Sequence, residues 1–256
     1  MPDGLRILAA GLLFAAGAAT ALADDTPTYT VIVQDYPSLP PYSAYRDGEY
    51  TGFNRELLDL FAESRGYRFE YVAYPVKRLF YEFVNGAGDL KYPDNAHWAL
   101  YIKKDAPIHY SDAAVEYVNG VLVPPARVGA GVEDIAKLGL VTGWTPLGFQ
   151  DQIADGAVEL LENSSYAGLL KQAILGRIDG AYSNVATSRF YLRNVLKQPE
   201  ALVFDSSLPH VRSARVLSSI KHPELIEEFN AFLVEEADAI AELKAIHAAE
   251  DGVAIN

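Results

Sequence analysis

The sequence predicts an α/β protein made of two similar units, each a mainly parallel sheet flanked by helices. Strand-like alternation and helical periodicity follow one another along the chain, which is typical of parallel strands joined by right-handed crossovers. A helix that ends in Gly86-x-x-Asp89 leads into a strand, and a later helix that ends in Gly176-x-x-Asp179 leads into another. This internal echo predicts two lobes of similar design.

The stretch from residue 40 to residue 89 carries the clearest pattern. A first helix is predicted from Asn54, whose side chain is the expected N-cap, to Gly66 at the C′ position. Residues 68–74 then alternate as a strand does. A second helix is predicted after Pro75, because the first turn of a helix does not need the N–H that proline lacks. The apolar positions of this helix recur at helical spacing: Val76, Leu79, Phe80, Phe83 and Val84.

The remaining elements are predicted from the same two periodicities. A first strand covers residues 28–33, and a strand over residues 115–123 leaves the first lobe. In the second lobe, Ser164 or Ser165 is the expected N-cap of a helix whose apolar positions start at Tyr166. The other elements predicted for the second half are a short helix (132–137), strands (138–142, 157–161 and 178–182) and helices (185–196, 223–236 and 238–247). Residues 202–204 are expected to return towards the first lobe.

Composition narrows the range of functions. The chain has 256 residues and a net charge of −13 at pH 7. Nucleic-acid binding is not expected, because neutralising phosphates requires a basic surface. The chain has no cysteine, which excludes disulfides, thiol catalysis and cysteine-bound metal. We expect no metal and no cofactor, because the five histidines are scattered without ligand spacing and the sequence has no phosphate-binding, dinucleotide-binding or nucleophile-elbow motif.

The N-terminus has the features of an export signal. Arg6 forms a short positively charged region, residues 7–19 are apolar and small, and Ala21-Leu22-Ala23 is an Ala-x-Ala cleavage site. The apolar run is short for a membrane span. We therefore expect a signal peptide over residues 1–23, a mature chain that starts at Asp24, and a periplasmic location. A lipid anchor is not expected, because no cysteine follows the apolar run.

Four short motifs occur in order in the first lobe: Pro40-Pro41-Tyr42, Asp47-Gly48, Gly52-Phe53 and Gly86-x-x-Asp89. As an ordered set they resemble type II periplasmic solute-binding proteins of the amino-acid type (family 3), which serve ABC importers. The resemblance implies a ligand cleft between two lobes, hinge closure on a small molecule, and delivery to an inner-membrane ABC permease by a monomeric protein. The composition shift at Pro124-Pro125 and the following glycines places the first crossover between lobes near Tyr117. We therefore expect residues 24–117 and 205–256 to form lobe 1 and residues 118–204 to form lobe 2.

The resemblance also points to ligand-binding residues. Tyr42 is at the family's aromatic position after the first strand, and Arg78 lies off the apolar stripe of its helix, facing either the cleft or solvent. The family has a strand-to-helix loop at the cleft where this chain has Gly143-Trp144-Thr145. Trp144 is expected to stack on the ligand and Thr145 to donate a hydroxyl. Packing inside a lobe is the alternative for both aromatic residues.

The chain departs from amino-acid binders at both ends of their ligand clamp. Those proteins usually carry Thr-x-x-Arg after Gly-x-x-Asp, and the arginine holds the ligand carboxylate. The corresponding segment here has no arginine, and Asp94, Asn95 or Trp98 is expected to line the site instead. The aspartate that often holds the ligand ammonium is replaced by Asn184. A standard α-amino acid is therefore not the expected ligand. The altered clamp, the acidic chain and the many aromatic residues leave a cationic or zwitterionic compound, a peptide-like compound or an apolar compound open.

Two other functions remain open from the sequence. The fold also resembles periplasmic cyclohexadienyl dehydratases, and an enzyme of that kind would need a cleft carboxylic acid beside a carboxylate-binding arginine. A sensory or accessory protein that reports a ligand to a membrane partner would share the features of a transport protein. We expect a binding protein rather than an enzyme, because the sequence offers no catalytic motif.

Overall fold

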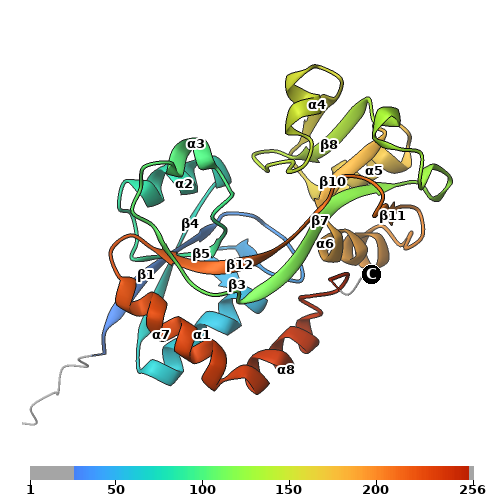
Figure 1. Ribbon diagram of the computed structural model, residues 1–256. Coiled ribbons are helices and arrows are strands. Elements are labelled where there is room, and N and C mark those ends of the chain that lie inside the picture. The colour runs from blue at the N-terminus through green and yellow to red at the C-terminus, as the bar shows by residue number, and fades with distance from the viewer. Residues whose placement is uncertain (1–25, 254–256) are drawn as a thin grey trace, which may run out of the picture.

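The computed structural model describes residues 26–253 and shows an α/β protein of two lobes joined by two long strands (Figure 1). The predicted signal peptide over residues 1–23 lies outside the described residues. The strands of the main sheet are β1 (Thr28–Gln34), β4 (Arg68–Tyr74), β5 (Leu90–Asp94), β6 (His109–Tyr110), β7 (Val115–Val123), β8 (Lys137–Val141), β9 (Glu159–Asn163), β10 (Gly180–Asn184), β11 (Val203–Phe204) and β12 (Val211–Ser219). A separate hairpin is formed by β2 (Ala44–Arg46) and β3 (Glu49–Thr51).

Hydrogen bonding connects the strands in the order β4-β1-β5-β12-β7-β10-β8-β9, with β6 paired to β12 and β11 paired to β7. We call the part built on β4, β1, β5 and β6 lobe 1, and the part built on β10, β8, β9 and β11 lobe 2. Each lobe has a parallel centre, in which β1 lies between β4 and β5 and β8 lies between β9 and β10. The prediction of two similar, mainly parallel units is confirmed.

The strands β7 and β12 cross from one lobe to the other (Figure 1). Residues 211–215 of β12 pair antiparallel with residues 115–119 of β7. The rest of β12 continues along β5, while residues 119–122 of β7 continue along β10. The lobe boundaries expected after residues 117 and 204 fall inside β7 and at the end of β11. A pair of strands of this kind is a suitable hinge, because small rotations at it change the distance between the lobes.

Lobe 1 has helices on both faces of its sheet. Helices α1 (Phe53–Arg65), α7 (Pro223–Glu235) and α8 (Ala237–His247) cover one face, and α2 (Val76–Val84) covers the other. Since side chains alternate along a strand, Val31 and Val33 belong to the core under α1 and α7, whereas Ile32 packs against α2. The apolar sequence of β1 is explained by this burial on both faces.

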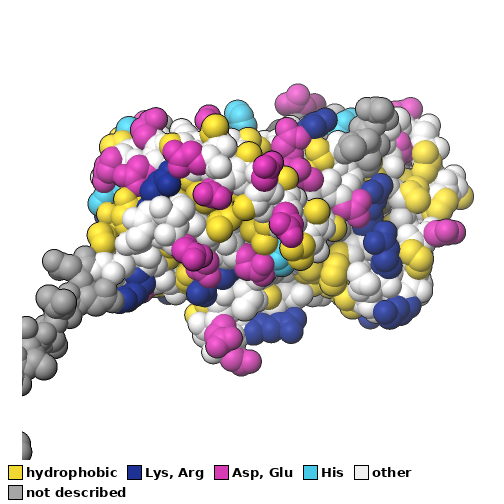
Figure 2. Space-filling view, turned by 90° about the horizontal axis from the view of Figure 1, so that it is seen from below, with side chains coloured by type: hydrophobic (Ala, Val, Ile, Leu, Met, Phe, Trp, Pro, Cys, Tyr) yellow, Lys and Arg dark blue, Asp and Glu magenta, His cyan; other side chains and the backbone are white. Residues whose placement is uncertain are grey.

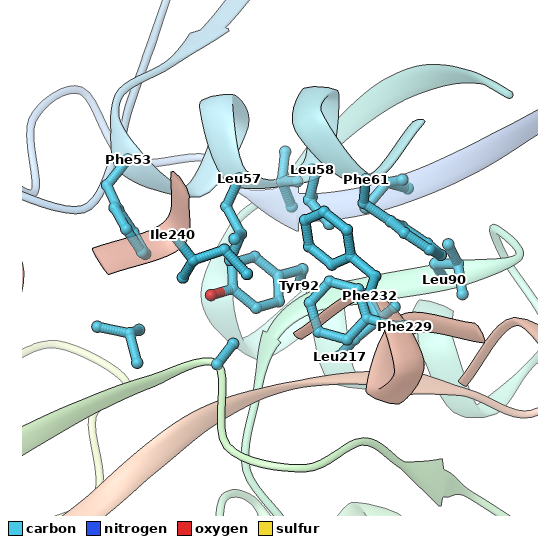
Figure 3. Packing of buried hydrophobic residues seen from close by; sticks show 14 of the residues in the cluster. Phe53, Leu57, Leu58, Phe61, Leu90, Tyr92, Leu217, Phe229, Phe232 and Ile240 are labelled. Atoms are coloured by element: carbon cyan, nitrogen blue, oxygen red, sulfur yellow. The ribbon is translucent and has the colours of Figure 1, made fainter. Parts of the chain in front are cut away.

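The core of lobe 1 is rich in aromatic rings. Figure 3 shows Phe61 of α1 facing Phe229 and Phe232 of α7. The ring centroid of Phe61 lies 5.1 Å from that of Phe229 and 5.2 Å from that of Phe232. Leu57 and Leu58 of α1 are fully buried in the same cluster. The apolar stripe predicted for the first helix therefore holds two distant parts of the chain together.

Lobe 2 packs around the helices α5 (Tyr166–Ile174) and α6 (Val185–Phe190), with α4 (Gln150–Ala154) at its outer end. The predicted cap of α5 is confirmed for Ser165, whose Oγ accepts a hydrogen bond of 3.1 Å from the backbone N–H of Gly168. Leu39, in the loop after β1, is 2% exposed and belongs to this lobe's core rather than to that of lobe 1. This leucine links the two lobes by apolar packing.

The helix α1 begins differently from the prediction, and Asn54 is not its N-cap. The N-cap is Gly52, at φ +96°. A Cβ at Gly52 would lie 2.9 Å from the backbone oxygen of Tyr42, so only glycine allows this close approach. Asn54 is instead fully buried, and its Nδ2 donates a hydrogen bond of 3.1 Å to the hydroxyl of Tyr50.

Two other sequence predictions need correction, and one strand was missed. The helix expected over residues 132–137 is only a 3-10 turn over Val132–Asp134, because the chain enters β8 at Lys137. The single helix expected over residues 185–196 changes from α6 to a π-helical segment over Tyr191–Val195. Strand β12 was not predicted at all.

The Gly-x-x-Asp echo has the same structural role in both lobes. The backbone of Asp89 donates to the carbonyl oxygen of Thr30, and its carboxylate accepts from the N–H of Thr30, both at 2.8 Å. The backbone of Asp179 likewise donates to the carbonyl oxygen of Lys137 at 2.8 Å, and its carboxylate accepts from the N–H of Lys137 at 2.7 Å. In each lobe this aspartate fixes the start of the central strand.

The outer surface is acidic and mixed. Figure 2, seen from below the view of Figure 1, shows Asp and Glu side chains spread over this face among Lys, Arg and apolar side chains. Charges spread in this way avoid a single strongly repulsive patch. None of the helices within residues 26–253 is long and apolar enough to span a membrane.

Candidate functional site

A cavity lies where the two lobes meet the crossing strands. It encloses about 650 Å³ of empty space, part of which is open to solvent. Lobe 1 contributes Gln34, Leu39, Val76, Leu79, Phe80, Lys91, Pro93 and Trp98, lobe 2 contributes Gly143, Trp144 and Thr145, and the crossing strands contribute Asn119 and Arg215. Walls from both lobes and from the crossing strands around one space are the arrangement expected of a site that binds a small molecule.

Aromatic side chains from both lobes form much of the cavity wall. The ring centroid of Trp98 lies 6.1 Å from that of Tyr117. On the opposite side, Trp144 packs edge-on against Tyr166 at 5.7 Å. The loop that carries Trp144 leaves the carboxyl end of β8 through Gly143, whose φ of +85° favours glycine. Apolar rings held in this way offer a rigid surface to a ligand.

Arg215 is the buried cation nearest to these rings. It is 5% exposed, and its guanidinium carbon lies 3.8 Å from the ring centroid of Tyr42, 5.3 Å from that of Tyr117 and 5.9 Å from that of Trp98. Its Nε is buried without a hydrogen-bond partner. No carboxylate among residues 26–253 forms an ion pair with it. Stacking on these three rings holds the Arg215 side chain in place, while its N–H groups stay available to a ligand.

A second group of charges lies behind the same wall. Asp94 is fully buried, and its Oδ1 lies 2.6 Å from Nζ of Lys103 and 3.0 Å from Nζ of Lys91. Its Oδ2 accepts a hydrogen bond of 2.6 Å from the hydroxyl of Ser218. Lys91 lines the cavity, and its Nζ lies 4.5 Å from the ring centroid of Phe80. Lys91 and Asp94 are both on β5, and a lysine between apolar residues of a buried strand is the sequence signal for this group.

The buried charges perturb one another's pKa values. Burial lowers the pKa of Lys91 to about 8, although Asp94 opposes this shift. Burial lowers the pKa of Lys103 as well, again against the effect of Asp94. Burial alone would raise the pKa of Asp94, but the two lysines outweigh it and hold that pKa below its usual value. Asp94 is therefore a carboxylate at neutral pH, and Lys91 titrates near pH 8.

The site offers little to a metal or to acid catalysis. Within residues 26–253, no group of three or more His, Asp or Glu side chains has an arrangement suited to a metal ion. The cavity lining contains neither Asp nor Glu. The polar groups of the lining are cations, amides and the hydroxyl of Thr145, and Lys91 is the one cation among them whose pKa is shifted towards neutrality.

Neither a protein-family model nor a curated protein matches the sequence. The structure, however, is similar to solved structures over most of its length. A substrate-binding protein of an ABC uptake transporter from Streptococcus pneumoniae, with bound histidine, aligns with a TM-score of 0.68 and 18% identity over 88% of this chain and 93% of that chain. The ligand-binding core of GluR0 with L-glutamate aligns with a TM-score of 0.69 and 14% identity over 87% and 99% of the two chains.

The chain has the fold of the type II periplasmic binding proteins. An ancestral amino-acid-binding protein, described as a precursor of cyclohexadienyl dehydratase, has the same fold, with a TM-score of 0.64 and 18% identity over 86% of this chain and 94% of that chain. At such low identities the similarity concerns the fold alone. Function has to be argued from the site.

Three of the residues expected to bind ligand line the cavity of this periplasmic-binding-protein fold: Trp98, Trp144 and Thr145. Tyr42 and Asn184 lie beside the cavity and contact each other across the lobes. The hydroxyl of Tyr42 donates to Oδ1 of Asn184 at 3.4 Å. Asn184 also serves as the N-cap of α6, because its Oδ1 accepts from the backbone N–H of Thr187 at 3.0 Å.

The other three expected residues are not part of the cavity lining. Arg78 is exposed and forms an ion pair of 2.9 Å with Glu82 on the same helix. Asn95 is buried, and its Nδ2 donates to the hydroxyl of Ser213 at 2.8 Å. Asp94 lies behind the wall in the lysine cluster. Asn95 and Asp94 thus support the wall, and Arg78 lies on the outer surface.

Four polar residues of the cavity were not anticipated from the sequence: Gln34, Lys91, Asn119 and Arg215. Lys91 and Asn119 interrupt predicted strands, and a polar residue within a buried strand is a usable signal. Gln34 follows the last predicted residue of the first strand. Arg215 lies on β12, whose sequence has only weak alternation, so no comparable signal marks it.

Proposed function

We propose that this protein is a periplasmic solute-binding protein that captures a small molecule between its lobes and delivers it to an inner-membrane ABC importer. The observation that carries the proposal is the cavity, whose lining comes from both lobes and from the two strands that cross between them. A ligand in such a cavity contacts both lobes only when they are close together. Its binding energy therefore favours the closed arrangement.

Contacts between the lobes support closure as the working motion. The loop of Gly143 approaches the start of α2, where a Cβ on this glycine would lie 3.6 Å from Cβ of Val76. The hydroxyl of Tyr191 in lobe 2 donates to the backbone oxygen of Ser38 at 2.8 Å. Together with the Tyr42–Asn184 hydrogen bond and the packing of Leu39 in lobe 2, these contacts stabilise a closed form.

The N-terminal sequence supports export, and a structural similarity supports transport. The segment over residues 1–23 has the composition of a signal peptide, and one structurally similar protein is described as part of an ABC uptake transporter. In this proposal the closed, ligand-bound monomer is the form that the permease recognises. An ATPase assay with the permease in liposomes separates transport from sensing, because only a transport protein stimulates ATP hydrolysis when ligand is present.

The enzyme alternative has less support. A dehydratase acting by acid catalysis requires a carboxylic acid in the cleft. The cavity lining has none, and the nearby Asp94 is held as a carboxylate by two lysines. Incubation of the purified protein with prephenate or arogenate tests this alternative, and we expect no turnover.

The proposal is tested by native mass spectrometry followed by small-angle X-ray scattering. Mature protein, residues 24–256, is purified under mild conditions, and any co-purified mass is identified in a denatured extract. That compound, or the strongest hit of a thermal-shift screen, is then added at saturation. We expect the radius of gyration to decrease. A radius that does not change at saturation contradicts capture by closure.

A further inference from the structure

We infer that the ligand is an organic anion, a carboxylate on an aromatic or apolar body that lacks an ammonium group, and that Arg215 is the residue that holds the carboxylate. This inference rests on the proposed function and specifies its ligand. It concerns a residue on the crossing strand β12, not the position after Gly-x-x-Asp where amino-acid binders carry their arginine.

The first argument is the balance of buried charge. Three cationic side chains around the cavity are nearly or fully buried: Lys91, Lys103 and Arg215. A single buried carboxylate, Asp94, accompanies them, and both of its ion pairs are with the lysines. A buried cation without a counter-ion is costly. A bound anion provides the missing counter-ion for Arg215.

The second argument is that Asp94 is not presented to a ligand ammonium, because it is fully buried and outside the cavity lining. Its Oδ1 accepts from Nζ of Lys103 at 2.6 Å and from the backbone N–H of Asn95 at 2.7 Å, and it lies 3.0 Å from Nζ of Lys91. Its Oδ2 accepts from the hydroxyl of Ser218. Since the lining has no other acidic side chain, an ammonium group would enter a positively charged site without a partner.

The third argument comes from unpaired polar atoms. Two buried side-chain nitrogens of the cavity-lining residues have no hydrogen-bond partner in the described structure, Nε of Arg215 and Nε2 of Gln34. Both are donors, and buried donors are normally paired. A carboxylate supplies the acceptors, and a guanidinium can bind it through two parallel hydrogen bonds. The unpaired atoms of the lining therefore favour an anion over a cation.

The body of the ligand is inferred from the rest of the wall. Most of the remaining lining is aromatic or aliphatic: Leu39, Val76, Leu79, Phe80, Trp98 and Trp144. Burying apolar surface against these side chains adds binding energy that a small polar anion such as acetate cannot gain. Thr145 and Asn119 leave room for one or two neutral hydrogen bonds to the body.

The test uses compounds that differ in one charged group. The panel contains 3-phenylpropionate, its neutral amide, 2-phenylethylamine and L-phenylalanine, together with further acid and amide pairs from butanoate to indole-3-acetate. Thermal shift and titration calorimetry on the mature protein rank them. We expect at least one acid to raise the melting temperature, and its amide, the amine and the amino acid to bind at least roughly tenfold more weakly.

Variants on one strand connect this preference to Arg215. Arg215→Gln is expected to weaken binding of the best acid by roughly 10- to 100-fold, and Arg215→Lys to restore part of the loss because it keeps the charge. Arg212→Gln is the matched control, since Arg212 is exposed on β12 and forms an ion pair with Glu116. Melting curves of the ligand-free variants show that each is folded.

The outcomes separate the inference from the proposed function. A strongest hit that carries an ammonium group, a panel in which no acid binds, or an unchanged affinity in Arg215→Gln overturns the inference. In each case the proposed function survives if some ligand of another class decreases the radius of gyration. If the best acid binds but leaves the radius unchanged, the ligand class stands and the proposed function fails.

Discussion

The guanidinium of Arg215 lies 3.8 Å above the ring of Tyr42, and the hydroxyl of Tyr42 in turn donates to Asn184 of lobe 2. Arg215 is on a strand that crosses between the lobes, so this short series of contacts joins the crossing strand, lobe 1 and lobe 2 beside the cavity. A ligand that binds Arg215 therefore acts where the relative position of the lobes is set.

The charge of Arg215 is expected to reduce the stability of the ligand-free protein. Replacing a buried charge with an apolar side chain of similar size is often stabilising, so Arg215→Met should raise the free energy of unfolding by about 1 kcal/mol. The exposed Arg212 provides the control, and Arg212→Met should change it by less than about 0.5 kcal/mol. Urea denaturation measures both. A marked loss of stability in Arg215→Met alone would show that the cation is already compensated without ligand.

Anion binding should weaken as the pH rises through the pKa of Lys91. Burial lowers that pKa to about 8, so Lys91 is charged below this pH and neutral above it. A bound anion favours the charged form, and a one-unit rise in pKa corresponds to about tenfold tighter binding at neutral pH than at pH 10. Calorimetry in two buffers of different ionisation enthalpy should therefore detect proton uptake near pH 8.

The groups around Lys91 define the controls for this experiment. Asp94 stays ionised at these pH values, and the rings of Phe80 and Trp98 do not titrate. Lys103 also has a lowered pKa and is the second group able to take up a proton. Lys91→Met should remove most of the proton uptake, whereas Lys103→Met should retain it. The reverse result would assign the titration to Lys103.

Leu39 should stabilise the closed arrangement. It is 2% exposed in the core of lobe 2, although it belongs to the loop after β1. Leu39→Ala should lower the free energy of unfolding by about 2–4 kcal/mol and increase the radius of gyration of the ligand-free protein. Leu100→Ala, at a leucine that is 56% exposed, is the control. An unchanged radius in Leu39→Ala would mean that this packing does not affect the hinge.

Asp179 should matter for stability and not for binding. Burial alone would raise its pKa, but hydrogen bonds from Lys137 and the Arg127 guanidinium hold that pKa below its usual value. The stability it contributes is therefore complete above about pH 4 and is lost as the pH falls through the lowered pKa. Asp179→Asn should cost about 1–2 kcal/mol at pH 7 with no change in ligand affinity, measured by urea denaturation and calorimetry. A tenfold change in affinity would contradict a purely structural role.

The sequence predicted well what depends on local periodicity and capping. Ser165 caps α5 because its hydroxyl reaches an N–H three residues ahead, a relationship visible in the sequence. The two Gly-x-x-Asp motifs were also recognised from the sequence, because each of them follows a predicted helix and precedes a predicted strand. Asn54 shows the limit of such reasoning, since the close approach of Gly52 to Tyr42 decided where α1 begins.

The site could not be derived in the same way, because its members meet only in three dimensions. The resemblance directed the search for a carboxylate-binding arginine to the segment after Asp89, which has none. Arg215 lies more than a hundred residues later, on a strand with little alternation. Asp94 was expected to line the site, but it lies behind the wall, where Lys91 and Lys103 contact its Oδ1 and Ser218 donates to its Oδ2. Sequence alone could not tell that Lys103, the last residue of the short helix α3 (Leu100–Lys103), would return to this carboxylate.

The most direct test of ligand capture between the lobes is the distance between them in solution. Because the chain has no cysteine, dyes can be attached uniquely to Lys104→Cys on lobe 1 and Ala154→Cys on lobe 2, both exposed. We expect a saturating organic acid to raise the energy transfer between the dyes, and Arg215→Gln to show no rise at the same concentration. Transfer that stays constant while the acid is bound would contradict capture between the lobes.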